Sequence, residues 1–181
     1  MRSLDLICRL LSTSKSREFF DEGFMKDIKT IEGDLHPRDA RFVIIASRFN
    51  EFVVNALIKG SLDCLLRHGV DKNSIEVVYV PGAYEIPLAA SKIAKTKRAD
   101  GIIALGTVIK GATSHFDYVS GECAKGLSSV QLDEGIPVGF GVLMVDTLEQ
   151  ALERAGTKSG NKGEEATLAV IEMINLLRKI D

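Results

Sequence analysis

The segment of this 181-residue chain whose residue types are best suited to chemistry runs from Gly106 to Asp117. It follows the apolar run Ile102–Leu105, which is typical of a buried strand, and a periodic helical pattern comes after it. It contains glycines, hydroxyls, a cation and His115, and an imidazole side chain suits acid and base catalysis near neutrality. A strand that runs through such a loop into a helix is where α/β enzymes usually bind ligands. The plainer interpretation of His115 is a hydrogen bond at the helix N-terminus.

The small residues Gly111–Thr113 lie just before the predicted helix. Backbone N–H groups there, together with the positive end of a helix dipole, favour an anion. The spacing of a Walker A motif is absent, and no GxGxxG follows a strand, so the sequence gives no support for a nucleotide or dinucleotide site. An ordinary turn between strand and helix is the alternative.

Three more loops are expected at the same edge of the sheet, because each follows an apolar strand: Ser47–Asn50, Pro81–Glu85 and Val145–Thr147. Phe49 could stack on a planar ring or pack in the core. Glu85 could accept hydrogen bonds from sugar-like hydroxyls or stabilise a helix start.

A glycine-rich basic loop spans Gly156–Gly163 and follows Arg154 directly. Arg154, Lys158 and Lys162 could bind a phosphate, and the arginine offers two parallel donors. A hinge between helices with solvated lysines is the alternative.

The elements that must position these residues alternate along the chain. Strands are expected at 41–47, 75–80, 101–107 and 137–144. The first helix is expected between Asn50, which would cap it, and Gly69. Two more are expected over residues 86–97 and 116–133. A short helix should begin at a capping box at Thr147, and a last helix should follow Gly163. Four strand–helix repeats predict a parallel sheet covered by helices on both faces.

Composition excludes several classes of function. The net charge is −2, aromatic residues make up 6% and Trp is absent, so nothing favours nucleic acid or a membrane surface as a partner. No apolar run approaches the ~20 residues of a transmembrane helix. The three cysteines, Cys8, Cys64 and Cys123, are an odd number and widely spaced, which favours reduced thiols in a cytoplasmic protein over disulfides or a metal site.

Residues 1–24 are interpreted as a poorly ordered N-terminal extension, with Met25 as an alternative start, and residues 25–181 as the domain. The segment Thr30–Leu35 is a candidate for an extra short strand. It has no evident partner in its own chain and could pair with the edge of a neighbouring subunit.

Together the motifs closely resemble those of the lumazine synthases (6,7-dimethyl-8-ribityllumazine synthases). The resemblance covers essentially everything from Met25 onward. The matching segments, in the family's order, are Ala46–Asn50, Val80–Pro87, Gly106–Asp117 and Glu153–Gly163. It implies a flavodoxin-like three-layer α/β/α sandwich, with a four-stranded parallel sheet plus a short N-terminal strand.

The resemblance also implies a transferase reaction, the penultimate step of riboflavin biosynthesis. Two small substrates, 5-amino-6-(D-ribitylamino)uracil and 3,4-dihydroxy-2-butanone 4-phosphate, condense to 6,7-dimethyl-8-ribityllumazine and phosphate. No metal or organic cofactor is implied.

Carried over residue by residue, the resemblance assigns a role to each matching position. Phe49 would stack on the pyrimidine, and Phe140 would cover the ring from a neighbouring subunit. Ala83, Tyr84 and Glu85 would hold the same substrate, with Glu85 on the ribityl hydroxyls. The backbone of Thr107, Val108 and Ile109 would bind the pyrimidine edge. Ala112, Thr113 and Arg154 would bind the phosphate, helped by Lys158 and Lys162, and His115 would transfer protons.

The family's members form pentamers, and some assemble into a sixty-subunit icosahedral shell; an association with riboflavin synthase is a further expectation. The compact Gly156–Gly163 loop resembles that of shell-forming members, whereas the N-terminal extension argues against shell packing. Two other classes of function compete: a flavodoxin-like domain that binds a flavin or phosphate without turnover, and a shell protein without activity.

Overall fold

The computed structural model describes residues 28–180. The chain divides into two compact units, Met1–Ile31 and Glu32–Asp181, and the second contains all the helices and strands of the described residues. The predicted extension, residues 1–24, lies outside the described residues, so the predicted boundary at 24/25 stays a prediction.

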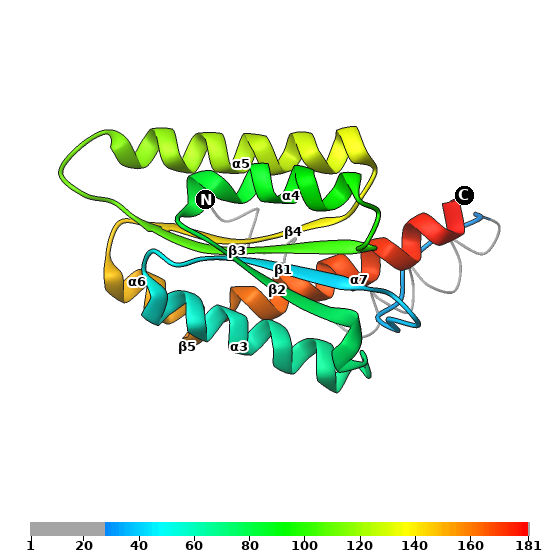
Figure 1. The fold of residues 1–181 in the computed structure, drawn as a ribbon. Helices are drawn as coiled ribbons and strands as arrows, with labels where there is room; N and C mark the ends of the chain where they lie inside the picture. The colour runs from blue at the N-terminus through cyan, green and yellow to red at the C-terminus, as the bar shows by residue number, and fades with distance from the viewer. Residues whose placement is uncertain (1–27, 181) are drawn as a thin grey trace, which may run out of the picture. The chain divides into compact units, whose positions relative to one another are not determined.

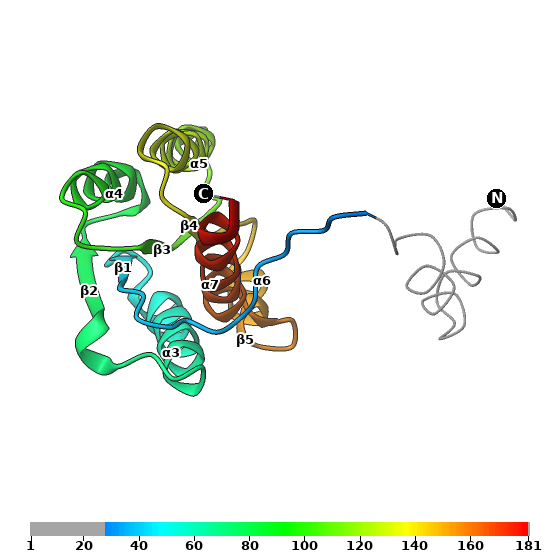
Figure 2. The ribbon, with the colours of Figure 1, turned by 90° about the vertical axis from the view of Figure 1, so that its right-hand side faces the viewer.

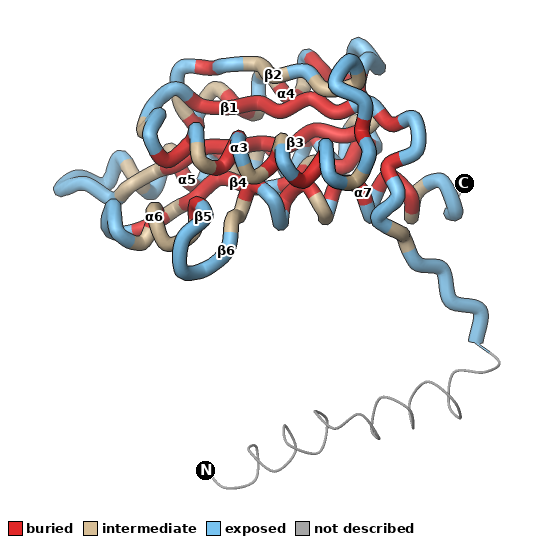
Figure 3. The backbone as a smooth tube through the Cα atoms, turned by 90° about the horizontal axis from the view of Figure 1, so that it is seen from below, coloured by how far each residue is buried: buried red, intermediate tan, exposed pale blue. Residues whose placement is uncertain are grey.

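The sheet has four parallel strands in the order β2-β1-β3-β4 (Figure 1). The strands are β1 (Phe42–Ser47), β2 (Ile75–Val80), β3 (Gly101–Ile109) and β4 (Val138–Val145). β1 is buried over its whole length, because helices cover both faces of a parallel sheet, and Figure 3 shows the same for most of β3. The predicted three-layer α/β/α fold with its four-stranded parallel sheet is confirmed.

The helices form two layers (Figure 2). α4 (Ile86–Lys95) and α5 (His115–Glu134) cover one face, where Ile86, Cys123 and Leu127 are buried against the sheet. α3 (Glu51–Arg67), α6 (Leu148–Arg154) and α7 (Lys162–Ile180) cover the other face, where Leu57 and Ile171 are fully buried. Each such large aliphatic side chain contributes roughly 1.5–3 kcal/mol relative to exposure.

Shorter elements connect these layers. Two 3-10 turns, η2 (Lys72–Ser74) and η3 (Ala83–Glu85), flank β2. A small antiparallel hairpin, β5 (Ala155–Thr157) and β6 (Gly160–Asn161), lies in the glycine-rich segment for which the sequence left a phosphate-binding loop or a hinge between helices open.

The predicted boundaries agree with the observed ones to within a few residues, and two details differ. Residues 30–35 form neither helix nor strand, so the extra N-terminal strand is not present within one chain. Asn50 precedes α3, but its side chain does not cap the helix. Its backbone is left-handed (φ 60°, ψ 40°), whereas side-chain capping needs extended backbone, so the predicted capping role is wrong.

The capping box predicted at Thr147 is present in modified form. The Thr147 hydroxyl accepts from the Gln150 N–H at 3.3 Å, and the Gln150 amide oxygen accepts from the Asp146 N–H at 2.8 Å. The return bond thus reaches one residue earlier than in the standard motif.

β3 and β4 extend further than β1 at the carboxyl end of the sheet. They stay paired as far as Ile109 and Val145, whereas the β1 ladder with β3 ends at Ala46 and Leu105. The end of β3 therefore continues beyond its neighbour on one side.

Glycines allow α3 and α7 to approach closely. A Cβ on Gly163, in the first turn of α7, would lie 2.2 Å from the Leu57 carbonyl oxygen on α3. On the sheet side, a Cβ on Gly139 of β4 would lie 2.5 Å from the Ala166 carbonyl oxygen on α7. A larger side chain at Gly163 would push α7 away from α3, and one at Gly139 would push β4 away from α7.

Candidate active site

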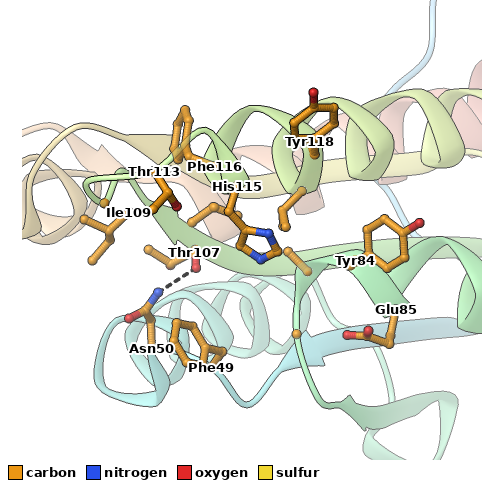
Figure 4. Close-up of a pocket in the computed structure, with 15 residues that line it drawn as sticks. Phe49, Asn50, Tyr84, Glu85, Thr107, Ile109, Thr113, His115, Phe116 and Tyr118 are labelled. Carbon is orange, nitrogen blue, oxygen red and sulfur yellow. Dashed lines mark hydrogen bonds between the residues drawn. The ribbon is translucent and has the colours of Figure 1, made fainter.

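A pocket of about 500 Å³ lies at the carboxyl ends of β1 and β3 (Figure 4). The chain runs from β1 to β2 on one side and crosses back to β3 on the other, so these two strands flank the point where the strand order reverses. Ligands of open α/β sheets bind at this position, and the volume suits a small molecule. Fifteen residues line the pocket.

Phe49 forms one wall. Its side chain is 71% exposed, which excludes the alternative that it packs in the core. The Phe49 N–H donates to the Pro81 carbonyl at 3.1 Å, so the loop after β1 is tied to the loop after β2. A large aromatic face held open to solvent at a pocket suits stacking on a planar ring.

The end of β3 forms the floor, through Thr107, Val108 and Ile109. The Lys110 N–H donates to Val145 on β4 at 2.9 Å. Because the backbone groups of successive residues in a central strand point alternately to the two sides, Thr107 and Ile109 direct theirs away from β4. β1 has already ended there, so this edge of β3 faces the pocket.

The loop after β2 forms the opposite wall with Ala83, Tyr84 and Glu85. Glu85 occupies the position before α4, and its side chain makes no cap hydrogen bond there. Glu85 lies where its negative charge favours the α4 dipole, so the helix-start alternative stays open beside the ligand-binding interpretation.

His115 is the first residue of α5, and its imidazole points into the centre of the pocket, between Phe116 and Phe49 (Figure 4). Gly111 and Thr113 line the pocket just before it, at the positive end of a 20-residue helix. This end of α5 is suited to bind an anion next to a group that can transfer protons.

The pocket brings together nine of the fourteen site residues that the sequence predicted. These are Phe49, Ala83, Tyr84, Glu85, Thr107, Val108, Ile109, Thr113 and His115. Ala112 lies between two lining residues without lining the pocket itself.

Phe140, Arg154, Lys158 and Lys162 do not line this pocket. Phe140 lies on the edge strand β4, is 46% exposed, and borders a second hollow of about 220 Å³ next to α5. The Arg154 guanidinium donates to the Gln150 carbonyl at 3.0 Å and lies 3.9 Å from Glu153. Lys158 pairs with Glu153 at 3.7 Å, and Lys162 with Glu165 at 2.6 Å.

Asn161 fixes the segment that carries these cations. Its amide group donates to the carbonyls of Ala56 on α3 at 2.9 Å and of Ala155 at 3.1 Å. Its amide oxygen accepts from the N–H groups of Gly163 at 2.8 Å and Glu164 at 3.3 Å. One side chain thus joins α3, the residue after Arg154 and the start of α7, so this segment is more ordered than the predicted hinge.

The sequence analysis gave no ligand-binding role to five lining residues, Asn50, Gly82, Phe116, Tyr118 and Val119, whereas Gly111 belongs to the segment that it predicted to bind an anion. Phe116 and Val119 are three residues apart, which is the spacing of one helix face, and that signal could have indicated a pocket wall. Asn50 gave no comparable signal, because its role depends on a carbonyl 57 residues further along the chain.

Thr107 carries a buried hydroxyl at this floor. Its side chain is 2% exposed, and Oγ1 has no hydrogen-bond partner within the described residues. Leaving a buried hydroxyl unpaired typically costs about 1–3 kcal/mol, so this hydroxyl lowers the stability of the free protein.

Cys64 and Cys123 are free and buried, and burial raises the pKa of each thiol to about 11. They are inert core residues, and Cys8 lies outside the described residues. The His68 ring nitrogen lies 2.8 Å from the Cys64 carbonyl, so this side chain forms a hydrogen bond at the C-terminal end of α3. Within residues 28–180, no three metal-ligating side chains cluster and no helix is long and apolar enough to cross a bilayer.

Comparison with known proteins gives the family. Residues 39–178 match the family model described as 6,7-dimethyl-8-ribityllumazine synthase. The chain belongs to this family. A relative from Nitratidesulfovibrio vulgaris (strain DSM 19637 / Miyazaki F), named 6,7-dimethyl-8-ribityllumazine synthase, is 52% identical over 156 residues, which are 86% of this chain and 100% of the relative.

The family confirms the predicted resemblance and the predicted activity, the transferase condensation step of riboflavin biosynthesis. It also decides against a flavodoxin-like binding domain from outside this family. The residues that perform the reaction are a separate question, which the geometry of the pocket addresses.

Proposed function

We propose that the pocket at the ends of β1 and β3 is where 5-amino-6-(D-ribitylamino)uracil and 3,4-dihydroxy-2-butanone 4-phosphate condense. One observation carries this assignment: the exposed face of Phe49 and the open edge of β3 line the same small pocket. A pyrimidine that stacks on Phe49 presents its N–H and C=O groups to the backbone of Thr107 and Ile109. The ribityl chain then extends toward Glu85, whose carboxylate accepts hydrogen bonds from hydroxyls.

The four-carbon substrate binds with its phosphate at the start of α5. Backbone N–H groups between Gly111 and Thr113 donate to the phosphate, and the helix dipole favours its charge. Ala112 contributes through its backbone, which requires no side chain in the pocket. The phosphate then lies next to His115, so the leaving group and the proton carrier are neighbours.

The reaction needs positioning and proton transfer, which this residue set supplies. The 5-amino group attacks the ketone, water leaves to give an imine, phosphate is eliminated, and the ribityl-bearing nitrogen closes the ring with loss of a second water. His115 accepts and returns protons in these steps. Holding two reactants together lowers such a barrier by ~7–11 kcal/mol in favourable cases, and a positioned acid–base group adds ~10²–10⁴-fold.

The site is completed by a second copy of the chain. None of the fifteen lining residues is Lys or Arg, although a phosphate dianion needs a cation. Arg154 and Phe140 lie outside the pocket, and Phe140 is exposed on an edge strand. We assign to a neighbouring subunit the Arg154 that pairs with the phosphate and the Phe140 that covers the ring. Lys158 and Lys162 add positive charge around it.

Two experiments test this assignment. Incubation with both substrates should yield the lumazine chromophore and one phosphate per turnover, and Phe49→Ala should weaken pyrimidine binding more than binding of the four-carbon phosphate. Equal loss for both substrates would place Phe49 outside the pyrimidine site.

Complementation tests the shared site. Co-expressed His115→Ala and Arg154→Ala chains should form mixed oligomers in which about a quarter of the sites combine an intact pocket with an intact neighbour. Activity well above that of either variant alone is expected. Activity no higher than the average of the two variants would show that each site is built from one chain.

The assembly is proposed to be a cytoplasmic homopentamer that packs further into a sixty-subunit shell and associates with riboflavin synthase. The compact β5–β6 hairpin, without an insertion, supports the shell. The free, buried Cys64 and Cys123 are consistent with a reducing compartment. Gel filtration with light scattering decides the size, and a pentamer-sized peak refutes the shell.

A further inference from the structure

Asn50 occupies a special place between the loop that carries Phe49 and the start of α3. Its backbone is left-handed, with φ 60° and ψ 40°. Its side chain does not cap the helix and instead donates from Nδ2 to the Thr107 carbonyl at 2.8 Å (Figure 4). Asn50 therefore links the wall and the floor of the pocket directly.

The loop after β1 contacts the ends of two other strands. On one side, the N–H groups of Arg48 and Phe49 donate to the carbonyls of Val80 and Pro81, at 2.8 and 3.1 Å. On the other side, the β1–β3 ladder has ended at Ala46 and Leu105. Beyond that point β1 makes no backbone hydrogen bond to β3, and the Asn50 side chain provides the hydrogen bond to Thr107 of β3 instead.

The residue type fits both demands on this position. Asn tolerates left-handed backbone better than most residues with a side chain, and its amide group provides an N–H donor. Gly would accept the same backbone but offers no donor. Asp would also accept it, but an ionised carboxylate only accepts hydrogen bonds and would face the Thr107 carbonyl unfavourably.

The Asn50 side chain is not needed to start the helix. The first bonds of α3 run from the N–H groups of Val53 and Val54 to the Asn50 backbone carbonyl, at 3.0 and 3.1 Å. Asn50 itself is only half-buried. Removing its amide therefore leaves the start of α3 and the core beneath it in place.

We propose that Asn50 is a positioning residue for pyrimidine binding: its bond to Thr107 fixes the Phe49 ring relative to the β3 edge. This inference rests on the proposed function of the pocket. One planar ring must stack on Phe49 and hydrogen-bond to β3 at the same time. Hydrogen bonds tolerate only a few tenths of an ångström around their preferred length, so a loop that shifts away from β3 loses one contact or the other.

The test compares Asn50→Gly, which keeps the left-handed backbone, with Asn50→Asp, which also keeps the shape of the side chain. Calorimetry measures the Kd of 5-amino-6-(D-ribitylamino)uracil for the assembled enzyme, and steady-state kinetics give kcat and both KM values. Both variants should bind the pyrimidine about three- to tenfold more weakly, the effect expected for one lost hydrogen bond. The KM of the four-carbon phosphate and the melting temperature should change little.

A double-mutant cycle separates positioning from direct contact with the substrate. If Asn50 acts through Phe49, Asn50→Gly should have little further effect on pyrimidine affinity in a Phe49→Ala background. Fully additive effects would show that Asn50 contacts the pyrimidine itself and would overturn the proposal.

The remaining outcomes are also decisive. Wild-type pyrimidine affinity in both Asn50 variants refutes the positioning role if Phe49→Ala still weakens binding. If Phe49→Ala also has no effect, the assignment of the pocket to the pyrimidine is what fails. A parallel rise in both KM values with a lower melting temperature would indicate a general structural role and refute the proposal. If Asn50→Gly does not fold, Asn50→Asp alone carries the test.

Discussion

Replacing Gly163 by alanine should destabilise the protein, although the same change usually stabilises a helix. Gly163 lies in the first turn of α7, against α3. A Cβ there would lie 2.2 Å from the Leu57 carbonyl oxygen, 2.9 Å from the Leu57 carbonyl carbon and 3.0 Å from the Asn161 amide oxygen. Two of these three atoms are backbone, so neither can rotate away.

The magnitude follows from two opposing effects. Alanine gains up to about 0.5–1 kcal/mol over glycine inside a helix. Overpacking against fixed backbone typically costs about 1–3 kcal/mol, and each Asn161 hydrogen bond disturbed by the shift costs about 0.5–1.5 kcal/mol more. The free energy of unfolding should therefore fall by about 1–3 kcal/mol, which lowers Tm by roughly 2–12 °C for a chain of this size.

Gly121 provides the matched control. It lies on α5, and a Cβ there would meet no atom within 4 Å, so Gly121→Ala should raise stability by up to about 1 kcal/mol. Melting curves of both variants and the wild type are compared at one protein concentration, because Tm depends on concentration for any protein that associates. If Gly163→Ala melts at or above the wild-type temperature, the close approach of α3 and α7 is wrong.

Three further predictions concern the site. His115→Ala should slow turnover by ~10²–10⁴-fold without abolishing it, because positioning remains, and complete loss of activity in stopped-flow assays would contradict this ranking. Arg154→Ala should raise the KM of the four-carbon phosphate at least about tenfold, since one charge-assisted hydrogen bond contributes about 1.5–3 kcal/mol. The pyrimidine Kd should stay nearly unchanged. An equal effect on both substrates would argue against phosphate binding by Arg154. Thr107→Val should raise Tm of the free enzyme because it removes an unpaired buried hydroxyl, and a lower Tm would show that this hydroxyl has a partner in solution.

The sheet and its helices were predictable because each strand is a continuous apolar run and each helix has a clear apolar face. The run Phe42–Ser47 is buried at every position, as a central parallel strand requires. The pocket followed from the rule that ligands bind beyond the carboxyl ends of such strands, and His115 and Phe49 were found in this way.

What the sequence did not predict depends on contacts between distant segments. Asn50 looks like a helix cap, since Asn commonly has that role, and only the position of Thr107 in space gives its amide another partner. The glycines of Gly156–Gly163 are typical of a flexible hinge. In the structure this segment includes part of a short hairpin, and the Asn161 side chain bonds it to α3. Arg154 and Phe140 do not line the pocket of their own chain, and the proposal that a neighbouring subunit supplies them rests on the family resemblance rather than on any pattern in the sequence.

The end of β3 that passes beyond β1 also bears on how the protein avoids unwanted association. Exposed strand edges are templates on which other chains add strands and aggregate. This edge is only a few residues long, and Asn50 already occupies the carbonyl of Thr107. A peptide needs several consecutive pairs to dock as a strand, whereas a flat ring needs only two or three hydrogen bonds. In the proposed site, this short backbone edge is therefore suited to a small molecule and not to another polypeptide.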